Sequence, residues 1–125
     1  MTSIKSYKDL LIWQKGIEIV DEVYKMTKLF PSEENFSLTS QVKRCSVSIP
    51  SNIAEGWGRE SEQSFLNFLR IARGSLYELE TQVEIAFRQG YIDSHQQKKV
   101  VQLLTEESKM LSSFMNKLKS RIASH

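Results

Sequence analysis

The side chains that could carry out catalysis or bind a metal ion are few and widely spaced in this chain. It contains a single cysteine, Cys45, and two histidines, His95 and His125. Metal centres in helical bundles combine inward-facing glutamates with Glu-x-x-His pairs, and neither histidine has a glutamate at that position. One cysteine cannot supply an internal disulfide or a zinc site built from several thiolates. We therefore expect neither a metal nor a cofactor.

The residues for a nucleophilic or phosphate-binding site are equally scarce. Cys45 or a serine would need a positioned histidine or lysine as its base, and the residue spacing singles none out. Gly56-Trp57-Gly58 is too short for a phosphate-binding loop and lacks the lysine-serine or lysine-threonine pair that follows one. Glu55 fits a capping or hydrogen-bonding role at a helix end better than an acid–base role. The sequence thus predicts a protein that is not an enzyme.

Basic residues provide the remaining candidate site. They fall in the second predicted helix, the following turn and the third predicted helix, and they comprise Lys43, Arg44, Arg59, Arg70 and Arg73. If these two helices are antiparallel, such residues could form a strip that neutralises phosphates. The alternative is that they are solvated charges or partners of nearby glutamates. The net charge of +2 permits nucleic-acid binding without arguing for it.

Composition limits what can position these residues. The chain has 125 residues, of which 40% are hydrophobic and 26% are charged, which suits one folded domain with one core. Two prolines and five glycines are too few for a fold made of many turns, so long elements are favoured. No apolar run approaches the roughly 20 residues that cross a bilayer. The segment from Met1 to Lys5 lacks the apolar stretch of a signal peptide, so we expect a soluble, cytoplasmic protein without membrane contact.

Helical periodicity predicts a single all-α domain over residues 1–125. The first helix is expected to begin near Ser6, whose spacing to Asp9 resembles a capping box. Its apolar residues form two rows, which suggests cover by neighbouring helices on two sides or by another subunit. Short connections favour an antiparallel up-down-up-down four-helix bundle. The expected helices span roughly 6–29, 37–56, 62–89 and 94–122.

Two interior positions break the apolar pattern. Pro50 lies inside the second helix, where it removes one hydrogen bond and leaves the carbonyl of Ser46 without its helical partner. Because the periodicity resumes after Pro50, we expect a kinked helix and not a break. In the fourth helix, Glu107 interrupts the apolar seam. The third helix has no such interruption, and its heptad-like seam is typical of a left-handed bundle.

Three segments carry a resemblance to a known family: Gln41-Val42-Lys43-Arg44, then Ser48-Ile49-Pro50-Ser51-Asn52-Ile53-Ala54-Glu55-Gly56 with Arg59, and the run from Phe65 to Glu80. They resemble the bacterial four-helix bundle proteins encoded within intervening sequences of 23S ribosomal RNA genes, also called S23 ribosomal proteins. The accessory variability determinant of diversity-generating retroelements is similar to these proteins.

The resemblance implies a homopentamer of four-helix bundles, without catalysis, whose basic surface engages structured RNA or a reverse transcriptase. Pro50, Asn52, Glu55 and Gly56 match the signature box of the family. For these we predict a structural role, in which Asn52 and Glu55 hold the backbone that Pro50 loosens. For RNA contact we predict the basic set named above.

Two functions of different classes therefore stand. The first is a non-catalytic, oligomeric accessory protein that binds RNA or a ribonucleoprotein. The alternative is a protein–protein interaction module, which docks a partner such as a reverse transcriptase without touching nucleic acid. The doubled apolar face of the first helix favours the alternative.

Overall fold

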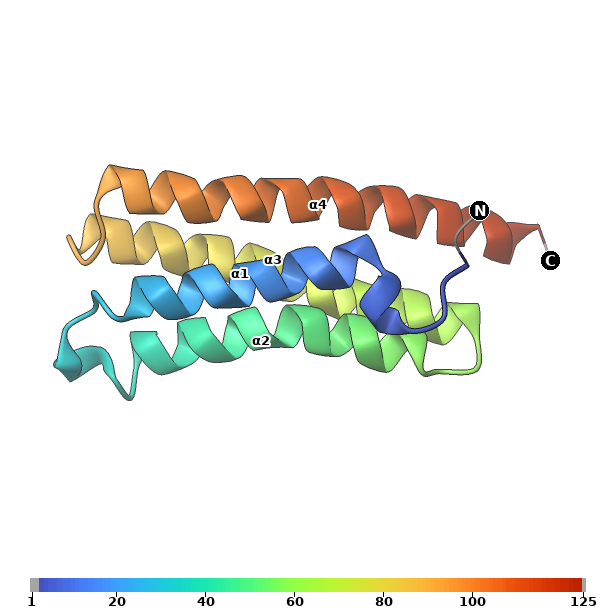
Figure 1. Ribbon diagram of the computed structural model, residues 1–125, viewed down its shortest axis with the longest axis horizontal. Coiled ribbons are helices and arrows are strands. Elements are labelled where there is room, and N and C mark those ends of the chain that lie inside the picture. The colour runs from blue at the N-terminus through green and yellow to red at the C-terminus, as the bar shows by residue number, and fades with distance from the viewer. Residues whose placement is uncertain (1–2, 125) are drawn as a thin grey trace.

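Four α-helices lie side by side in the computed structural model, which describes residues 3–124 (Figure 1). They are α1 (Leu11–Thr27), α2 (Leu38–Trp57), α3 (Glu62–Arg88) and α4 (Ser94–Ala123), with short 3-10 helices η1 (Tyr7–Asp9) and η2 (Ser32–Glu34). Each helix packs against the next, and α4 closes the bundle against α1. Consecutive helices run in opposite directions, and no strand occurs in residues 3–124. The predicted all-α, antiparallel four-helix bundle is confirmed.

The start of α1 differs from the prediction. The capping box between Ser6 and Asp9 is present, because the Lys8 N–H donates to Ser6 Oγ at 3.0 Å and the Ser6 N–H to Asp9 Oδ2 at 3.1 Å. This capping box, however, caps the start of the short helix η1 and not of α1. Leu10, which follows η1, adopts an extended backbone with ψ 128°. Leu10 is only 5% exposed, so its burial in the core interrupts the helix. The α-helix therefore begins at Leu11 and not near residue 6, whereas the other three lie within one residue of their predicted bounds.

The second helix continues through its proline. Pro50 lies inside α2, which is helical without a break from Leu38 to Trp57. A Cβ atom added to Gly16 of α1 would lie 3.2 Å from Pro50 Cβ, which is tighter than an ordinary contact. Glycine at this position therefore lets α1 pass closely over the proline ring. The predicted continuity of α2 across Pro50 is confirmed.

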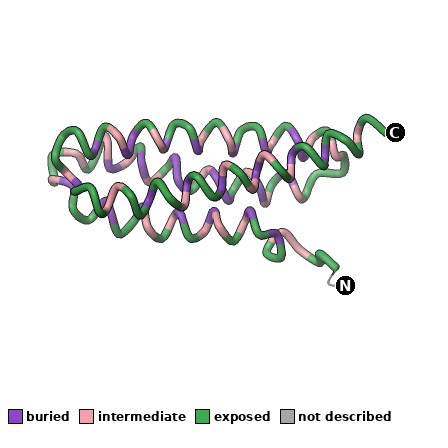
Figure 2. The backbone as a smooth tube through the Cα atoms, turned by 90° about the horizontal axis from the view of Figure 1, so that it is seen from above, coloured by how far each residue is buried: buried purple, intermediate pink, exposed green. Residues whose placement is uncertain are grey.

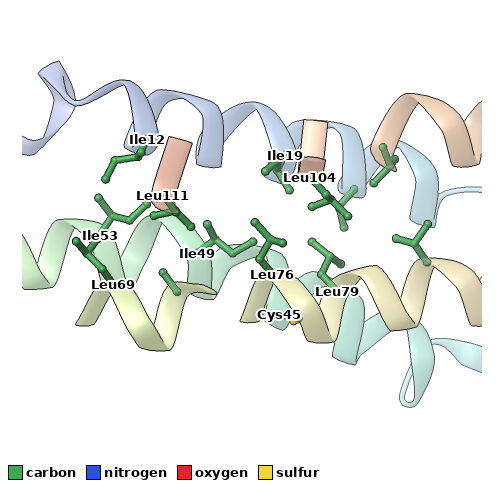
Figure 3. Close-up of a cluster of buried hydrophobic side chains, with 14 of the residues drawn as sticks. Ile12, Ile19, Cys45, Ile49, Ile53, Leu69, Leu76, Leu79, Leu104 and Leu111 are labelled. Atoms are coloured by element: carbon green, nitrogen blue, oxygen red, sulfur yellow. The ribbon is translucent and has the colours of Figure 1, made fainter. Parts of the chain in front are cut away.

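One contiguous core fills the space between the helices. Figure 2 shows that buried residues recur along each helix and alternate with exposed ones. The side chains of Ile49, Leu76 and Leu104 from three different helices converge in this core (Figure 3), and each is 0% exposed. The predicted seam of α3 is wholly buried; it consists of Phe65, Leu69, Ala72, Leu76, Leu79, Val83 and Ala86. The interrupted seam of α4 buries Glu107 together with its apolar neighbours.

The two apolar rows of α1 are covered unequally. Ile19 and Val23, from one row, are 0% exposed, whereas Tyr24 from the other is 41% exposed. Trp13, Ile17 and Val20 of that second row are half-buried. The neighbouring helices thus bury one row completely and leave the other partly open.

Glycines end α2 and α3 in different ways. Gly58 caps α2 with an ordinary helical φ of −76°. Gly90 follows α3 with φ of +79°, and the next N–H, that of Tyr91, donates to the Ala86 carbonyl at 3.0 Å. This arrangement suits the left-handed conformation that glycine adopts without steric cost. Gly90 therefore closes the C-terminal end of α3.

Candidate nucleic-acid interface

The structure separates the two basic residues of α2. Lys43 is half-buried on the side that faces α1, where its Nζ lies 5.0 Å from the centre of the Tyr24 ring. Arg44 is exposed on the side that faces α3, and its Nη2 donates to Ser40 Oγ at 2.9 Å. Adjacent helical positions point about 100° apart, so these neighbours in sequence belong to different surfaces.

The arginines after α2 also spread over more than one surface. Arg59 lies in the turn before α3, where its Nη2 pairs with Glu55 Oε1 at 3.0 Å. Its Cζ lies 4.8 Å from the centre of the Phe68 ring. Arg70 is exposed on α3, and its Nη1 donates to Asn67 Oδ1 at 3.1 Å. Three exposed arginines, Arg44, Arg59 and Arg70, therefore belong to α2, α3 and the turn that joins them.

Arg73 lies on a different edge of α3. The α4-facing edge is marked by Glu62, which pairs with Arg121 at 2.6 Å, and by Glu84, which accepts from Gln97 at 2.9 Å. Arg73 falls midway between these two glutamates, at a spacing of three helical turns from each. It therefore shares their edge beside α4. The predicted basic residues do not form one continuous strip.

Arg44 borders a hollow of about 320 Å³ between α2 and α3, lined by Gln41, Arg44, Cys45, Ser48, Ser75 and Glu78. The Cys45 thiol donates to the Ser75 carbonyl at 2.9 Å. Burial, together with the nearby Glu78 carboxylate, raises the pKa of Cys45 to about 12. A nucleophilic cysteine needs a lowered pKa, so this thiol stays protonated and packs as a small core side chain.

The residues of the signature box connect α2 to α3. Asn52 Nδ2 donates to the Ser48 carbonyl at 2.8 Å and to Ser48 Oγ at 2.9 Å. Ser48 Oγ in turn lies 2.8 Å from Ser75 Oγ on α3. Asn52 thus braces the carbonyl of Ser48, whereas the carbonyl that Pro50 deprives of its partner is that of Ser46. Glu55 is exposed and pairs with Arg59, away from the proline.

Gly56 is the point of closest approach between α2 and α3. An added Cβ would lie 2.7 Å from Phe68 Cβ and 2.8 Å from Phe65 Cδ1. Real Cβ contacts do not come this close, so only glycine fits here without movement of the helices. Gly56 is buried inside α2, one residue before the helix ends, so the structural role predicted for it is a packing role.

Other expectations concern metals and membranes. Within residues 3–124, no three His, Cys, Asp or Glu side chains are grouped so as to hold a metal ion. His95 is exposed at the start of α4, and His125 lies outside the described residues. In the same range, no helix has the length and apolar character needed to span a membrane.

A surface that the sequence reasoning missed is the outer face of α3. Three large apolar side chains there are exposed: Ile71 at 52%, Tyr77 at 51% and Ile85 at 43%. All three lie outside the heptad seam of α3, and large apolar residues outside a buried seam were the sequence signal that could have revealed this surface. Ile71 and Ile85 are about four helical turns apart and share one side of α3, whereas Tyr77 points about 120° away from Ile71. Exposed apolar residues that share one side of a helix are typical of an interface with another chain.

The fold and the hydrogen-bonded link between α2 and α3 place this chain among small antiparallel four-helix bundle proteins. Within that class, the model of the family described as "23S rRNA-intervening sequence protein" matches residues 8–113. The chain belongs to this family, as its signature box predicted.

A solved structure supports the same assignment. A protein of unknown function from the S23 ribosomal protein family of Bacteroides thetaiotaomicron is similar, with a TM-score of 0.78 and 28% sequence identity. The similarity covers 84% of this chain and 98% of that one. A comparison with curated proteins found no match.

Proposed function

We propose that this protein is a non-catalytic, oligomeric accessory protein that binds structured RNA through the exposed arginines of α2, α3 and the turn between them. The observation that carries this proposal is the exposure of Arg44, Arg59 and Arg70 on these adjoining elements. Guanidinium groups bind phosphates through paired hydrogen bonds. The Arg59–Glu55 pair is exposed at both side chains, and such surface pairs contribute little stability, so Arg59 is free to exchange its carboxylate for a phosphate.

Self-association would strengthen this weakly charged surface. One chain carries a net charge of only +2, but an oligomer repeats each exposed arginine and so raises the avidity for an extended polyanion. The exposed Ile71 and Ile85 supply apolar area for contacts between copies. We propose the homopentamer that the family resemblance implies, with the side of α3 that carries Ile71 and Ile85 at the interface between subunits. Arg70 points about 100° away from Ile71 on the helix and lies outside that contact.

An arginine-to-alanine series tests the RNA surface. Replacing Arg59 or Arg70 with alanine should weaken binding to structured RNA and lower the slope of log affinity against log salt by about 1 for each phosphate that is no longer bound. Arg88→Ala is the matched control, because Arg88 is also an exposed α3 arginine paired with a glutamate four residues away. RNA affinity measured by fluorescence anisotropy at two salt concentrations distinguishes the Arg59 and Arg70 variants from the control. Failure of the wild-type protein to bind RNA even at low salt would refute the RNA function.

Light scattering tests the assembly. We expect a solution mass near five times the 14.5 kDa of one chain. Ile71→Glu should lower that mass, because it places a charge in an apolar contact and leaves it without a partner. Circular dichroism should show the same helix content, since Ile71 is exposed in the single chain. A monomeric wild-type protein would remove the oligomer from the proposal, and a pentameric Ile71→Glu variant would place the interface elsewhere.

A second groove favours the alternative function, in which the protein docks a partner chain. The hollow between the start of α1 and α4 has a volume of about 350 Å³ and is lined by Leu11, Ile12, Lys109, Met110, Ser113, Phe114 and Lys117. Leu11 is 68% exposed, and both charged lining residues are lysines. These features suit an acidic protein segment with apolar side chains. Co-purification of one stoichiometric protein that survives nuclease treatment would favour this function over RNA binding.

A further inference from the structure

Glu107 is a buried carboxyl group without a hydrogen-bond partner. Its side chain is 0% exposed, and within the described residues neither Oε1 nor Oε2 has a donor or acceptor within reach. Burying an ionised carboxylate without a partner is among the largest penalties in a protein interior, and such groups usually neutralise instead. The position therefore calls for a proton or a compensating charge.

Three helices meet at this carboxyl. Glu107 comes from α4, and a Cβ added to Gly16 of α1 would lie 3.4 Å from Glu107 Oε2 and 3.4 Å from Pro50 Cδ of α2. Glycine at 16 thus makes room both for the proline ring and for the carboxyl group. Pro50 has no N–H to offer, so the nearest part of α2 provides no donor.

The charged groups around Glu107 do not neutralise it. On α1, Lys15 attracts the carboxylate and Glu18 repels it. Lys15 Nζ is already shared between Glu18 at 3.3 Å and Glu106 of α4 at 3.5 Å. Among the buried residues of α2 only Cys45 is titratable, and it bonds to the Ser75 carbonyl. The buried residues of α3 include no titratable group.

Burial therefore dominates the titration of this group. It raises the pKa of Glu107 from its ordinary value of 4.5 to about 8, although the attraction of Lys15 acts in the opposite direction. At neutral pH the side chain is thus held mainly as the uncharged acid.

We propose that Glu107 is a buried proton-binding site, and that loss of its proton loosens the packing of α4 against α1 and α2. The contact between α1 and α4 offers the route by which the charge reaches water. Leu103, one helical turn before Glu107, borders a hollow of about 300 Å³ that Glu18 and Glu22 also line. Lys15 lies at the same surface, with 19% of its side chain exposed. The closure of the bundle is in this way coupled to pH.

The sign of the pH dependence follows from where the proton binds more tightly. Glu107 binds its proton more tightly in the folded chain than in the unfolded chain, so its contribution is fully present below pH 4.5 and is lost as pH rises to about 8. Within that window the folding equilibrium constant should fall about tenfold per pH unit because of this one group. Above the window the effect levels off.

The test is urea unfolding of the wild-type protein and of Glu107→Gln between pH 5 and pH 9, at one protein concentration. The other titrating groups are common to both proteins, so the difference between the two profiles isolates Glu107. We expect the wild type to lose stability relative to Glu107→Gln as pH rises, and the difference to level off above about pH 8. If Glu107→Gln folds poorly, Glu107→Leu can replace it as the reference, because leucine needs no hydrogen bond. The wild type should lose stability relative to Glu107→Leu over the same pH range. Parallel profiles for the wild type and both variants would overturn the proposal.

A direct measurement on the wild-type protein avoids any dependence on the variants. Carbon-13 NMR of the glutamate carboxyl groups should reveal one resonance that titrates far above the others and that disappears in Glu107→Gln or Glu107→Leu. In Lys15→Met, that resonance should titrate at still higher pH, because the attracting cation is gone. A merely structural role for Lys15 would leave the titration unchanged. A Glu107 carboxyl that is ionised at pH 6 would overturn the proposal.

Discussion

Replacing Gly56 with alanine should lower the free energy of unfolding by about 1–3 kcal/mol, the range measured for overpacked cores. Alanine is the better helix former, by up to about 1 kcal/mol in an exposed helix, so propensity alone predicts the opposite sign. The contact decides the outcome, because the new Cβ would lie 2.7 Å from Phe68 Cβ. A Cβ atom cannot rotate away, and so α2 and α3 must separate. Urea unfolding followed by circular dichroism measures the change.

Gly58→Ala is the matched control, two positions further along the chain. Its added Cβ would meet the Glu55 carbonyl at an ordinary 3.5 Å, and its φ of −76° suits any residue. We expect a change within about 0.5 kcal/mol, as for other surface substitutions. If both variants are equally stable, the close approach at Gly56 is not a determinant of stability.

Much of the fold could be predicted from local sequence patterns. The seam of α3 repeats without interruption, and all of its positions are buried in the fold, so local pattern and packing agree along the whole element. The start of α1 could not be predicted in the same way. Ser6 and Asp9 form a genuine capping box, but whether a full helix follows depends on Leu10. The core draws that side chain inward, and this is a tertiary effect that the local pattern does not contain.

The candidate site was less predictable, because periodicity fixes the spacing on one helix and not its rotation against the neighbours. Lys43 and Arg44 were predicted to share one basic strip, yet the first stacks on Tyr24 of α1 and the second borders Ser75 of α3. Arg73 turns toward α4 for the same reason. The expected role of Glu55 likewise depended on proximity in sequence to Pro50, whereas Arg59 is its partner in space.

Glu107 shows both the reach and the limit of the sequence. A glutamate in an otherwise apolar seam stands out from the pattern alone. That it meets no donor follows only from the fold, in which Gly16 of α1 and Pro50 of α2 face it. Neither residue offers a polar side chain, and they lie far from Glu107 along the chain. The chemistry of this group is therefore a property of the packed bundle.

Replacing Leu76 with alanine should cost about 2–5 kcal/mol, the range for large-to-small changes in well-packed cores. Leu76 is 0% exposed at the centre of the bundle, where it converges with Ile49 and Leu104 (Figure 3). Truncation removes packing against α2 and α4 at once, and the rigid helices can close the resulting cavity only in part. The measurement is urea unfolding at two protein concentrations, so that any contribution from assembly appears as a concentration dependence.

Ile71→Ala is the matched control for Leu76→Ala, because it makes a similar truncation on the same helix at a side chain that is 52% exposed. Within the single chain it should change stability by no more than about 0.5 kcal/mol. If the side of α3 that carries Ile71 forms the interface between subunits, Ile71→Ala should instead weaken assembly at low concentration, and Leu76→Ala should leave the interface residues in place. Core packing and assembly would then be separated on one helix. Equal losses of stability in the two variants, independent of concentration, would contradict this division.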